Sequence, residues 1–348
     1  MSPHRRGSRG ATIADVAKLA GVSTATVSRA LHGSANVGPG TLEKVARAAE
    51  ELNFSVTRSA SALASGRTNR IALLNGGQLA HWFVSEILQG SYTHLNQSNM
   101  DLLIYRAGSR TEREQFFTAL PARRNADAML VTSFALEAEE VTALESLGMP
   151  VVYLNMPYDD RPNVSIDDVA AGSGVARHLI GLGHRRLAFV GTGLTHLGFD
   201  WSSDDRSRGF AEQINASEHA ISFESITVAN TPRAASEAVT QILNLSPIPT
   251  GIFVLHDELA LAITHILRQR GLRVPEDISV IGFDDHPLAE PFGLTTVRQP
   301  VEEIGRRGAE LAVKLARGED PGNTNISIPT SLIMRTTSST PQASVLLS

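Results

Sequence analysis

The chain has 348 residues, of which 42% are hydrophobic and 19% are charged, and its net charge is −5. This length predicts two or more domains, and the composition excludes disordered and collagen-like chains. The chain has no cysteine, which excludes disulfides, thiolate nucleophiles and thiolate metal sites and fits a reducing compartment.

The charge is distributed unevenly along the chain. Residues 1–70 contain 10 Lys and Arg against 4 Asp and Glu, or +6, so the remainder carries 21 against 32, or −11. A basic head on an acidic body indicates that the head binds a polyanion. No run of 18 apolar residues occurs, and Met1–Gly10 lacks the apolar stretch of a signal peptide. We therefore expect a cytoplasmic protein that does not enter a membrane.

The first predicted elements are two short helices joined by a turn. Thr12 precedes the first, and Asp15 stands where the acid of a capping box would be. Gly21 ends that helix, and Ser23 is a suitable cap for the second. The apolar positions of the two helices recur at spacings of three and four, at Ile13, Val16, Ala17, Ala20, Val27, Ala30 and Leu31. This pattern predicts a helix-turn-helix, completed by a third helix that begins at Pro39.

The outward face of the second helix suits the major groove of DNA. Thr24 and Ala25 would meet base edges, and Arg29 can make a bidentate contact to guanine. The remaining candidate DNA contacts are polar side chains that can bind phosphates, namely Thr12, Ser23, Thr26 and Ser28.

The run Ala11–Ser34, ATIADVAKLAGVSTATVSRALHGS, resembles the DNA-binding head of the LacI/GalR family of bacterial transcription regulators. The complete spacing VAxxAGVSxxTVSRxL carries the resemblance. It implies that Thr24 and Ala25 select the operator and that Arg29 reads a base. His32 differs from the asparagine that the family usually has there.

Residues 57–69 form the next segment, rich in Ser and Ala, with Leu63 as its one large apolar residue. Short helices are marginal in water, so we expect this linker to become helical only when two copies pack on DNA. The resemblance implies a hinge helix in the minor groove, capped by Thr57, with Leu63 wedged into a base step and Ala60 on the facing side. The alternative is a flexible linker with a chance leucine. Val56 and Thr57 stand where the family often has Pro and Asn.

From Arg70 onward, short apolar runs alternate with amphipathic stretches, which predicts a parallel α/β architecture in two lobes. The expected strands are Ile71–Leu74, Leu102–Tyr105, Ala128–Thr132, Val151–Leu154, Leu187–Gly191, Gly251–Leu255 and Ile278–Phe283. Two of the expected helices cover Val169–Leu182 and Glu258–Gly271.

The body also resembles this family, through HRRLAFVGTG, DELALAITHILRQRGLRVPEDISVIGFDD and LTTVRQP. The resemblance implies a periplasmic-binding-protein-like fold, three crossings between lobes near Val164, Leu294 and Asn325, and a homodimer. We expect a head at 1–56 and a body at 70–340 with a tail at 341–348. The first lobe would comprise about 70–163 and 295–325, and the second about 164–294 and 326–340.

A ligand of such a fold binds between the lobes, outside the carboxyl ends of the strands. The resemblance implies that Arg206 and Asp284 contact the effector, and facing each other across a cleft they could bind vicinal hydroxyls. The alternative is a buried ion pair between them. The remaining candidates are ring-facing residues of the first lobe and polar residues at the other strand ends, namely His81, Trp82, Phe83, Asn155, Asp200, Trp201, Asn230 and His256. Core packing is an equal alternative for Phe83.

These side chains favour a sugar or sugar derivative over a purine as the effector. No catalytic arrangement stands out, the paired acids lack histidines at metal-ligand spacing, and Gly191-Thr192-Gly193 lacks the rest of a dinucleotide fingerprint. We therefore expect no enzyme, no cofactor and no metal. The prediction is a dimeric repressor of the LacI/GalR type that binds a pseudo-palindromic double-stranded DNA operator under effector control. The alternative class is a cytosolic small-molecule carrier with an incidental basic arm.

Overall fold

The computed structural model describes residues 11–31, 37–52, 54, 67–133, 136–158, 160–193 and 201–342, without the side chains of 201–203. The chain divides into two units, Met1–Asn69 and Arg70–Ser348. Each is considered by itself below.

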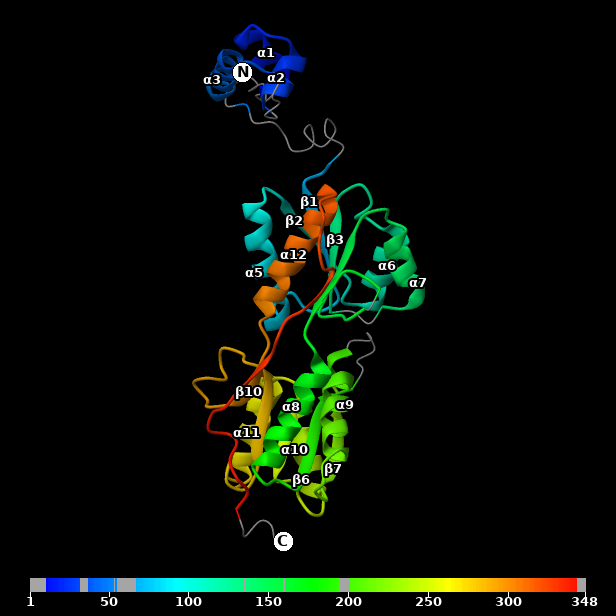
Figure 1. Ribbon diagram of the computed structural model, residues 1–348, viewed down its shortest axis with the longest axis vertical. Coiled ribbons are helices and arrows are strands. Elements are labelled where there is room, and N and C mark those ends of the chain that lie inside the picture. The colour runs from blue at the N-terminus through cyan, green and yellow to red at the C-terminus, as the bar shows by residue number, and fades with distance from the viewer. Residues whose placement is uncertain are drawn as a thin grey trace, which may run out of the picture. The chain divides into compact units, whose positions relative to one another are not determined.

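The first unit is a small bundle of three helices (Figure 1): α1 (Ile13–Ala20), α2 (Thr24–Leu31) and α3 (Pro39–Glu51). Gly21 ends α1 in the left-handed conformation (φ 68°), which glycine adopts without strain. The three helices bury one another's small apolar side chains, which include Val16, Val27 and Val45. The predicted helix-turn-helix is therefore present.

The second unit consists of two α/β lobes, each built on a six-stranded sheet flanked by helices (Figure 1). The first sheet is parallel throughout and has the order β11-β5-β4-β3-β1-β2. Its strands are β1 (Arg70–Asn75), β2 (Asp101–Arg106), β3 (Ala128–Thr132), β4 (Val151–Leu154), β5 (Asn163–Ser165) and β11 (Asn325–Ser327). The helices of this lobe are α5 (Trp82–Gln97), α6 (Arg110–Ala119), α7 (Ala138–Glu145) and α12 (Val301–Arg317).

The second sheet has the order β12-β10-β9-β8-β6-β7, and only β12 runs antiparallel to its neighbour. Its strands are β6 (Arg186–Thr192), β7 (Ser222–Val228), β8 (Gly251–Val254), β9 (Ser279–Asp284), β10 (Thr295–Arg298) and β12 (Ser331–Ile333). The helices of this lobe are α8 (Asp168–Gly181), α9 (Trp201–Asn215), α10 (Ala234–Asn244) and α11 (Asp257–Gln269).

The lobe boundaries differ from the prediction most at the second of the three crossings. β10 pairs with β9, so Thr295–Arg298 belongs to the second lobe and the chain crosses after Arg298, not near Leu294. β5 ends at Ser165 and its partner β11 ends at Ser327, so the first and last crossings lie close to the predicted Val164 and Asn325. The apolar run in β10 continues the second sheet, and Pro300 then leads into α12, which packs in the first lobe.

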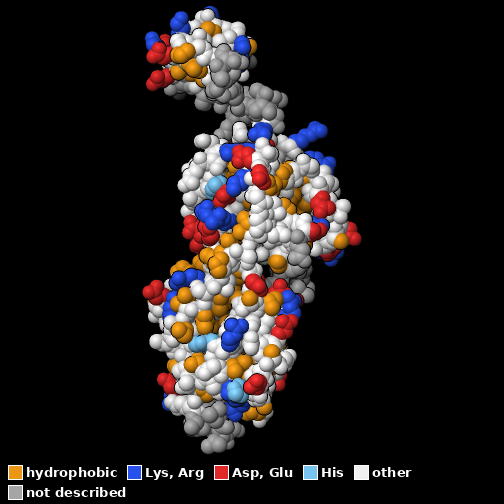
Figure 2. Space-filling view, viewed as in Figure 1, with side chains coloured by type: hydrophobic (Ala, Val, Ile, Leu, Met, Phe, Trp, Pro, Cys, Tyr) orange, Lys and Arg blue, Asp and Glu red, His pale blue; other side chains and the backbone are white. Residues whose placement is uncertain are grey.

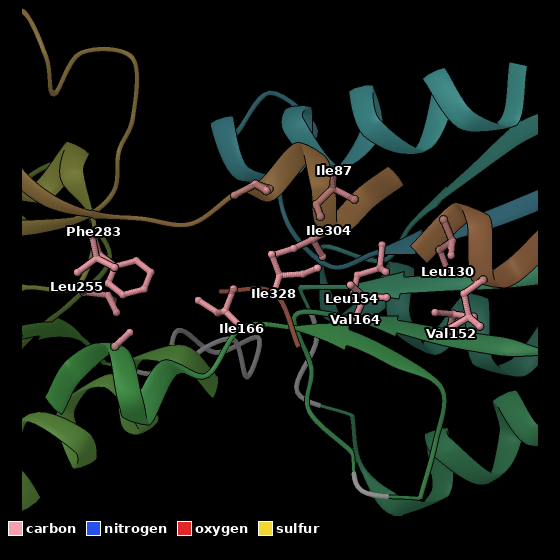
Figure 3. Packing of buried hydrophobic residues seen from close by; sticks show 14 of the residues in the cluster. Ile87, Leu130, Val152, Leu154, Val164, Ile166, Leu255, Phe283, Ile304 and Ile328 are labelled. Atoms are coloured by element: carbon pink, nitrogen blue, oxygen red, sulfur yellow. The ribbon is translucent and has the colours of Figure 1, made fainter. Parts of the chain in front are cut away.

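One buried apolar cluster continues from one lobe to the other through the crossing segments. Ile166 and Ile328, on two of these segments, lie between Phe283 of the second lobe and Val164 and Ile304 of the first (Figure 3). Burial of this surface holds the lobes together at the crossings.

Each lobe contains one pair of helices in unusually close contact. A Cβ atom on Gly90 of α5 would lie 1.9 Å from the Glu302 carbonyl oxygen of α12. In the second lobe, a Cβ atom on Gly209 of α9 would lie 1.9 Å from the Val169 carbonyl oxygen of α8. Only glycine permits these backbones to approach so closely.

The face of α12 carries a network of opposite charges (Figure 2). Glu303 binds Arg306 at 2.6 Å and Arg307 at 2.8 Å, and Glu310 binds Lys314 at 3.1 Å. Hydrogen bonds from Arg306 are the main reason that the pKa of Glu303 is lowered to about 2. Among the described residues, no helix is long and apolar enough to cross a membrane.

Candidate functional site

The first helix of the head begins at a complete capping box. The Asp15 backbone N–H donates to Thr12 Oγ1 at 3.3 Å, and the Thr12 backbone N–H donates to Asp15 Oδ2 at 2.8 Å. The hydrogen bonds from Thr12 hold the pKa of Asp15 below its usual value. In the second helix, the Thr26 backbone N–H donates to Ser23 Oγ at 3.1 Å, so Ser23 caps α2. The predicted capping box is confirmed.

The exposed face of α2 presents the residues predicted to read DNA. Thr24, Ala25 and Arg29 are exposed, whereas Val27 and Ala30 are buried. Arg29 Nε donates to the Ala25 carbonyl oxygen at 3.2 Å, so the two terminal nitrogens of its guanidinium are the donors that can reach a base. Thr26 and Ser28 are half-buried. The hinge candidates Thr57, Ala60 and Leu63 lie outside the described residues.

In the body, the carboxyl ends of strands from both lobes place polar side chains opposite one another. The segment after β1 leads to His81 and Trp82 at the start of α5, and the segment after β8 leads to His256 and Glu258 at the start of α11. His81 Nε2 lies 3.5 Å from Glu258 Oε2, and this contact joins the two lobes. The hydrogen bond to Glu258 raises the pKa of His81, and the same bond lowers that of Glu258.

Trp82 provides a second contact between the lobes. Its ring lies 5.4 Å from the ring of His286, which follows β9 in the second lobe. The Nε1 atom of Trp82 is buried and has no hydrogen-bond partner among the residues that the structure describes. Buried donors are almost always paired in folded proteins, so this N–H is a candidate ligand contact.

Arg206 is fixed inside the second lobe. It is 4% exposed, its Nε donates to Asp168 Oδ1 at 2.7 Å, and its Nη1 donates to the Leu255 carbonyl oxygen at 2.8 Å. Its guanidinium carbon lies 3.4 Å from the centroid of the Phe283 ring. The expectation that Arg206 and Asp284 face each other across a cleft is wrong, because α9 and β9 both belong to the second lobe. The ion pair of Arg206 is with Asp168, a residue that the sequence did not indicate.

Asp284 ends β9 and has a strained backbone. Its φ is 121° and that of Asp285 is 55°, both rare for residues other than glycine. Asp284 Oδ1 accepts a hydrogen bond of 2.5 Å from Gln299 Nε2. Burial raises the pKa of Asp284 to about 6, against the opposing effect of Arg206. Asp285 is held by Arg298 and Arg335, each at 2.7 Å.

His256 caps α11 and has a fixed tautomer. The Leu259 backbone N–H donates to His256 Nδ1 at 3.2 Å, so Nδ1 is the acceptor and Nε2 carries the proton of the neutral ring. Burial lowers the pKa of His256 to about 4. The next residue, Asp257, accepts hydrogen bonds from Thr296 Oγ1 at 2.7 Å and from the His286 backbone N–H at 2.8 Å.

The other predicted effector residues are placed differently. Phe83 packs against the apolar core, in agreement with the alternative interpretation. Asn155 Oδ1 accepts from the Ile166 backbone N–H at 3.4 Å, so this side chain supports a crossing segment. Asn230 is exposed after β7. Asp200 and the side chain of Trp201 lie outside what the structure describes.

A cavity of about 490 Å³ lies between the lobes beside the second crossing. Two of the predicted residues, Trp82 and Asp284, line it, whereas His81, Arg206 and His256 do not. The remaining lining residues are Glu86, Asp285, Arg298, Gln299, Pro300, Val301, Glu302, Glu303 and Arg306. Gln299 was not predicted, although it directly follows the strand pattern of LTTVRQP. Within the described ranges, no cluster of three His, Asp or Glu residues could hold a metal ion.

A helix-turn-helix with an exposed polar face, in a chain whose body has two α/β lobes around a polar cavity, defines a DNA-binding regulator. Residues 12–56 match the bacterial regulatory proteins of the lacI family, and residues 176–338 match the periplasmic binding protein-like domain. The chain belongs to the LacI family of transcription regulators. Its relatives are regulators and not enzymes.

Three characterised relatives show the extent of the similarity. The HTH-type transcriptional regulator DegA of Bacillus subtilis is 30% identical over 93% of this chain and 97% of its own length. The regulator CelR of Thermobifida fusca is 31% identical over the same shares. The repressor PurR of Vibrio atlanticus is 31% identical over 89% of this chain and 93% of its own.

Solved structures agree with this assignment. A CelR–cellobiose complex has a TM-score of 0.69 and 29% identity, covering 94% of this chain and 99% of that one. A lac repressor dimer bound to operator and an anti-inducer has a TM-score of 0.80 and 24% identity, covering 95% and 100%, and shows the shared fold.

Proposed function

We propose that this regulator is a repressor that binds a pseudo-palindromic operator as a homodimer and is controlled by a sugar or sugar derivative bound between the lobes of its body. The observation that carries the proposal is the cavity at the second crossing, where Trp82 of the first lobe and Asp284 of the second lobe line one polar space. A ligand there touches both lobes and therefore favours one angle between them. The CelR–cellobiose complex, which shares the fold, supports a sugar.

On the DNA side, α2 of each subunit enters a major groove of the operator. Thr24, Ala25 and Arg29 meet base edges, and the amino-terminal residues Thr12 and Ser23 lie near phosphates in addition to capping their helices. Two hinge segments lie between the heads, and Leu63 of each is wedged into a base step of the minor groove.

The two halves are coupled through the hinge. Each hinge joins the first lobe just before β1, so a change in the angle between lobes changes the separation of the two hinges in the dimer. A coupling of about 1 to 3 kcal/mol gives a 5- to 150-fold change in operator affinity. The same cavity and hinge allow the effector to act as an inducer, which weakens operator binding, or as a corepressor, which strengthens it.

The test combines two measurements on the purified full chain. A sugar library screened by thermal shift identifies ligands, because a ligand that binds the folded state raises its melting temperature. Operator affinity is then measured with and without each ligand and at several salt concentrations. We expect sequence-selective binding that a sugar changes at least fivefold. A protein that binds sugars but never DNA selectively would contradict the proposal and favour a carrier.

A further inference from the structure

We propose that His81 and Glu258 form a proton-dependent latch between the lobes, which favours the arrangement seen here while His81 is protonated and releases it when the ring loses its proton. The latch adds pH to the controls of this regulator and needs no bound ligand. Its effect on operator binding rests on the proposed coupling between the lobes and the hinge, whereas its effect on the lobes does not.

The latch is an ion pair between the starts of two helices in different lobes. His81 Nε2 lies 3.5 Å from Glu258 Oε2, and the two side chains are 47% and 49% exposed. His81 immediately precedes α5 of the first lobe, and Glu258 is the second residue of α11 in the second lobe. Because both side chains are half-exposed, solvent can exchange protons with the His81 ring. A change in pH therefore acts on the contact directly.

Both partners extend from a backbone that is held in place. The His81 backbone N–H donates to the Gln78 carbonyl oxygen at 3.0 Å, and the His81 carbonyl oxygen accepts from the Ser85 backbone N–H at 3.0 Å. Among the described residues, the His81 side chain makes no capping hydrogen bond to α5, so its ring is available to the other lobe. His256 caps α11, and Glu258 lies in the first turn, where the positive end of the helix dipole stabilises its negative charge.

The surrounding charges favour a protonated His81. The groups that act on the pair belong to the second lobe: His256 beside Glu258 on α11, Asp284 at the end of β9, and His286 after that strand. The contact with Glu258 raises the pKa of His81 above 6.5 against the opposing effect of burial, and Asp284 adds a smaller contribution. The same contact lowers the pKa of Glu258. Burial lowers the pKa of His256 to about 4, so His256 stays neutral where His81 titrates.

The direction of the pH response follows from these charges. Only a protonated His81 attracts the carboxylate, so the latch is complete below the raised pKa of His81 and above the lowered pKa of Glu258. It is lost as the pH rises through the pKa of His81. An ion pair between half-exposed groups contributes little, so its loss shifts the balance between lobe arrangements by up to about fivefold. Burial raises the pKa of Asp284 to about 6, so this group titrates in the same interval and the test must change His81 alone.

The first measurement is the titration of His81 in the full chain, by nuclear magnetic resonance of its 11 histidine rings. The His81 signal is the one that disappears in His81→Gln. We expect its pKa to lie above 6.5 in the parent protein and to fall below 6.5 in Glu258→Gln, because burial then outweighs the weaker attraction of Asp284. Glu237→Gln, which removes an exposed carboxylate from α10 of the same lobe, should leave the His81 titration unchanged. A pKa at or below 6.5 in the parent protein, or one that Glu258→Gln does not lower, overturns the latch.

The second measurement is the lobe arrangement, by fluorescence energy transfer without ligand. The chain has no cysteine, so dyes can be attached at two introduced ones, Glu139→Cys on α7 and Gln241→Cys on α10, both at exposed positions. Labelled chains are mixed with an excess of unlabelled parent chain, so that each measured pair of dyes lies within one subunit. The titration runs from about pH 5 to about pH 9, where ordinary carboxylates and lysines keep their charge.

Two substitutions of His81 should give opposite results in this titration. His81→Lys keeps a positive charge throughout, so energy transfer should stay at the low-pH value of the parent protein. His81→Gln carries no charge, so energy transfer should stay near the parent's high-pH value. If both variants retain the parent's pH profile, Asp284 or another group causes the change. If the parent protein has no pH profile, the contact does not hold the lobes. Either result overturns the latch.

Operator affinity separates the latch from the proposed function. Fluorescence anisotropy uses an operator duplex selected from random sequence. Between the two ends of the titration, the affinity of the parent protein should change by up to about fivefold more than that of His81→Lys, a comparison that removes the pH response of the head itself. If the lobes respond to pH as expected while the operator affinities of the two proteins change in parallel, the latch stands and the proposed coupling to the hinge fails.

Discussion

The guanidinium carbon of Arg206 lies 3.4 Å from the centre of the Phe283 ring, at the end of the strand that carries Asp284. A cation over an aromatic face is attracted by the ring quadrupole, most strongly when both are desolvated. Asp168 and the Leu255 carbonyl oxygen bind the same guanidinium from other directions. Arg206 is therefore a fixed positive charge that joins α8, α9 and the ends of β8 and β9.

This arrangement predicts that Arg206→Ala destabilises the body. Removal of one partner leaves Asp168 buried without its counter-charge, which typically costs about 3 to 5 kcal/mol. Urea denaturation should show this loss. Below the lowered melting temperature, operator binding should persist, because Arg206 lies in the body and not in the head. Arg208→Ala, on the same helix with its side chain 54% exposed, is the control and should change stability by less than about 0.5 kcal/mol. An unchanged free energy of unfolding in Arg206→Ala would contradict this structural role.

A second prediction concerns the close approach of α8 and α9. A Cβ at Gly209 would lie 1.9 Å from the Val169 carbonyl oxygen, so Gly209→Ala must push the helices apart and separate Arg206 from Asp168. We expect a loss of several kcal/mol in the free energy of unfolding. Gly174→Ala, within α8 but with nothing within 4 Å of its Cβ, should instead stabilise by up to about 1 kcal/mol. Equal effects of the two substitutions would show that the contact is unimportant.

The local features of the head could be predicted from the sequence because they depend on neighbours in the chain. The Thr12 and Asp15 capping box joins residues three apart, and the buried and exposed faces of α2 follow from its helical spacing. The long apolar strands of the body were likewise visible as runs. The edge strand β7 was missed because its residues alternate between buried and exposed positions and form no apolar run.

The contacts of the site could not be predicted because they join residues far apart in sequence. Asp168 binds Arg206 only because Gly172 and Gly209 allow α8 and α9 to touch. No local sequence pattern predicts this contact between helices. Glu258 lies beside His81 across two lobes. The crossing near Leu294 was placed wrongly because the sequence of a strand as short as β10 does not show which of the two sheets it joins. Only its pairing with β9 assigns it to the second lobe.

The third prediction is a dependence of stability on pH. Burial lowers the pKa of His184 from 6.5 to about 4, while its Nε2 donates to the Ser339 carbonyl oxygen at 2.9 Å. Protonation of His184 is less favourable in the folded state than in the unfolded state. The neutral ring therefore contributes fully to the unfolding free energy above pH 6.5, and this contribution is lost as the pH falls toward 4. His184→Gln should reduce the fall in unfolding free energy between pH 7 and pH 4 by up to about 3 kcal/mol. An unchanged profile in His184→Gln would mean that other groups cause the fall.

The fourth prediction concerns base reading by the head. Arg29 is exposed on α2, and its Nε bond to the Ala25 carbonyl oxygen at 3.2 Å holds the side chain along the face that carries Thr24 and Ala25. Loss of a bidentate contact to guanine costs about 1 to 3 kcal/mol, so Arg29→Ala should weaken operator binding about 5- to 150-fold.

The control for this prediction removes the same charge from another helix. Lys44→Ala, at an exposed position of α3, should weaken binding to operator and to random DNA equally and only slightly, because a phosphate contact carries no sequence information. Fluorescence anisotropy with operator and scrambled duplexes at two salt concentrations distinguishes the two variants. Arg29→Ala should lose selectivity while the body still binds effector, because the substitution lies in the other unit of the chain. Equal losses on both duplexes would make Arg29 a phosphate contact and remove it from base reading.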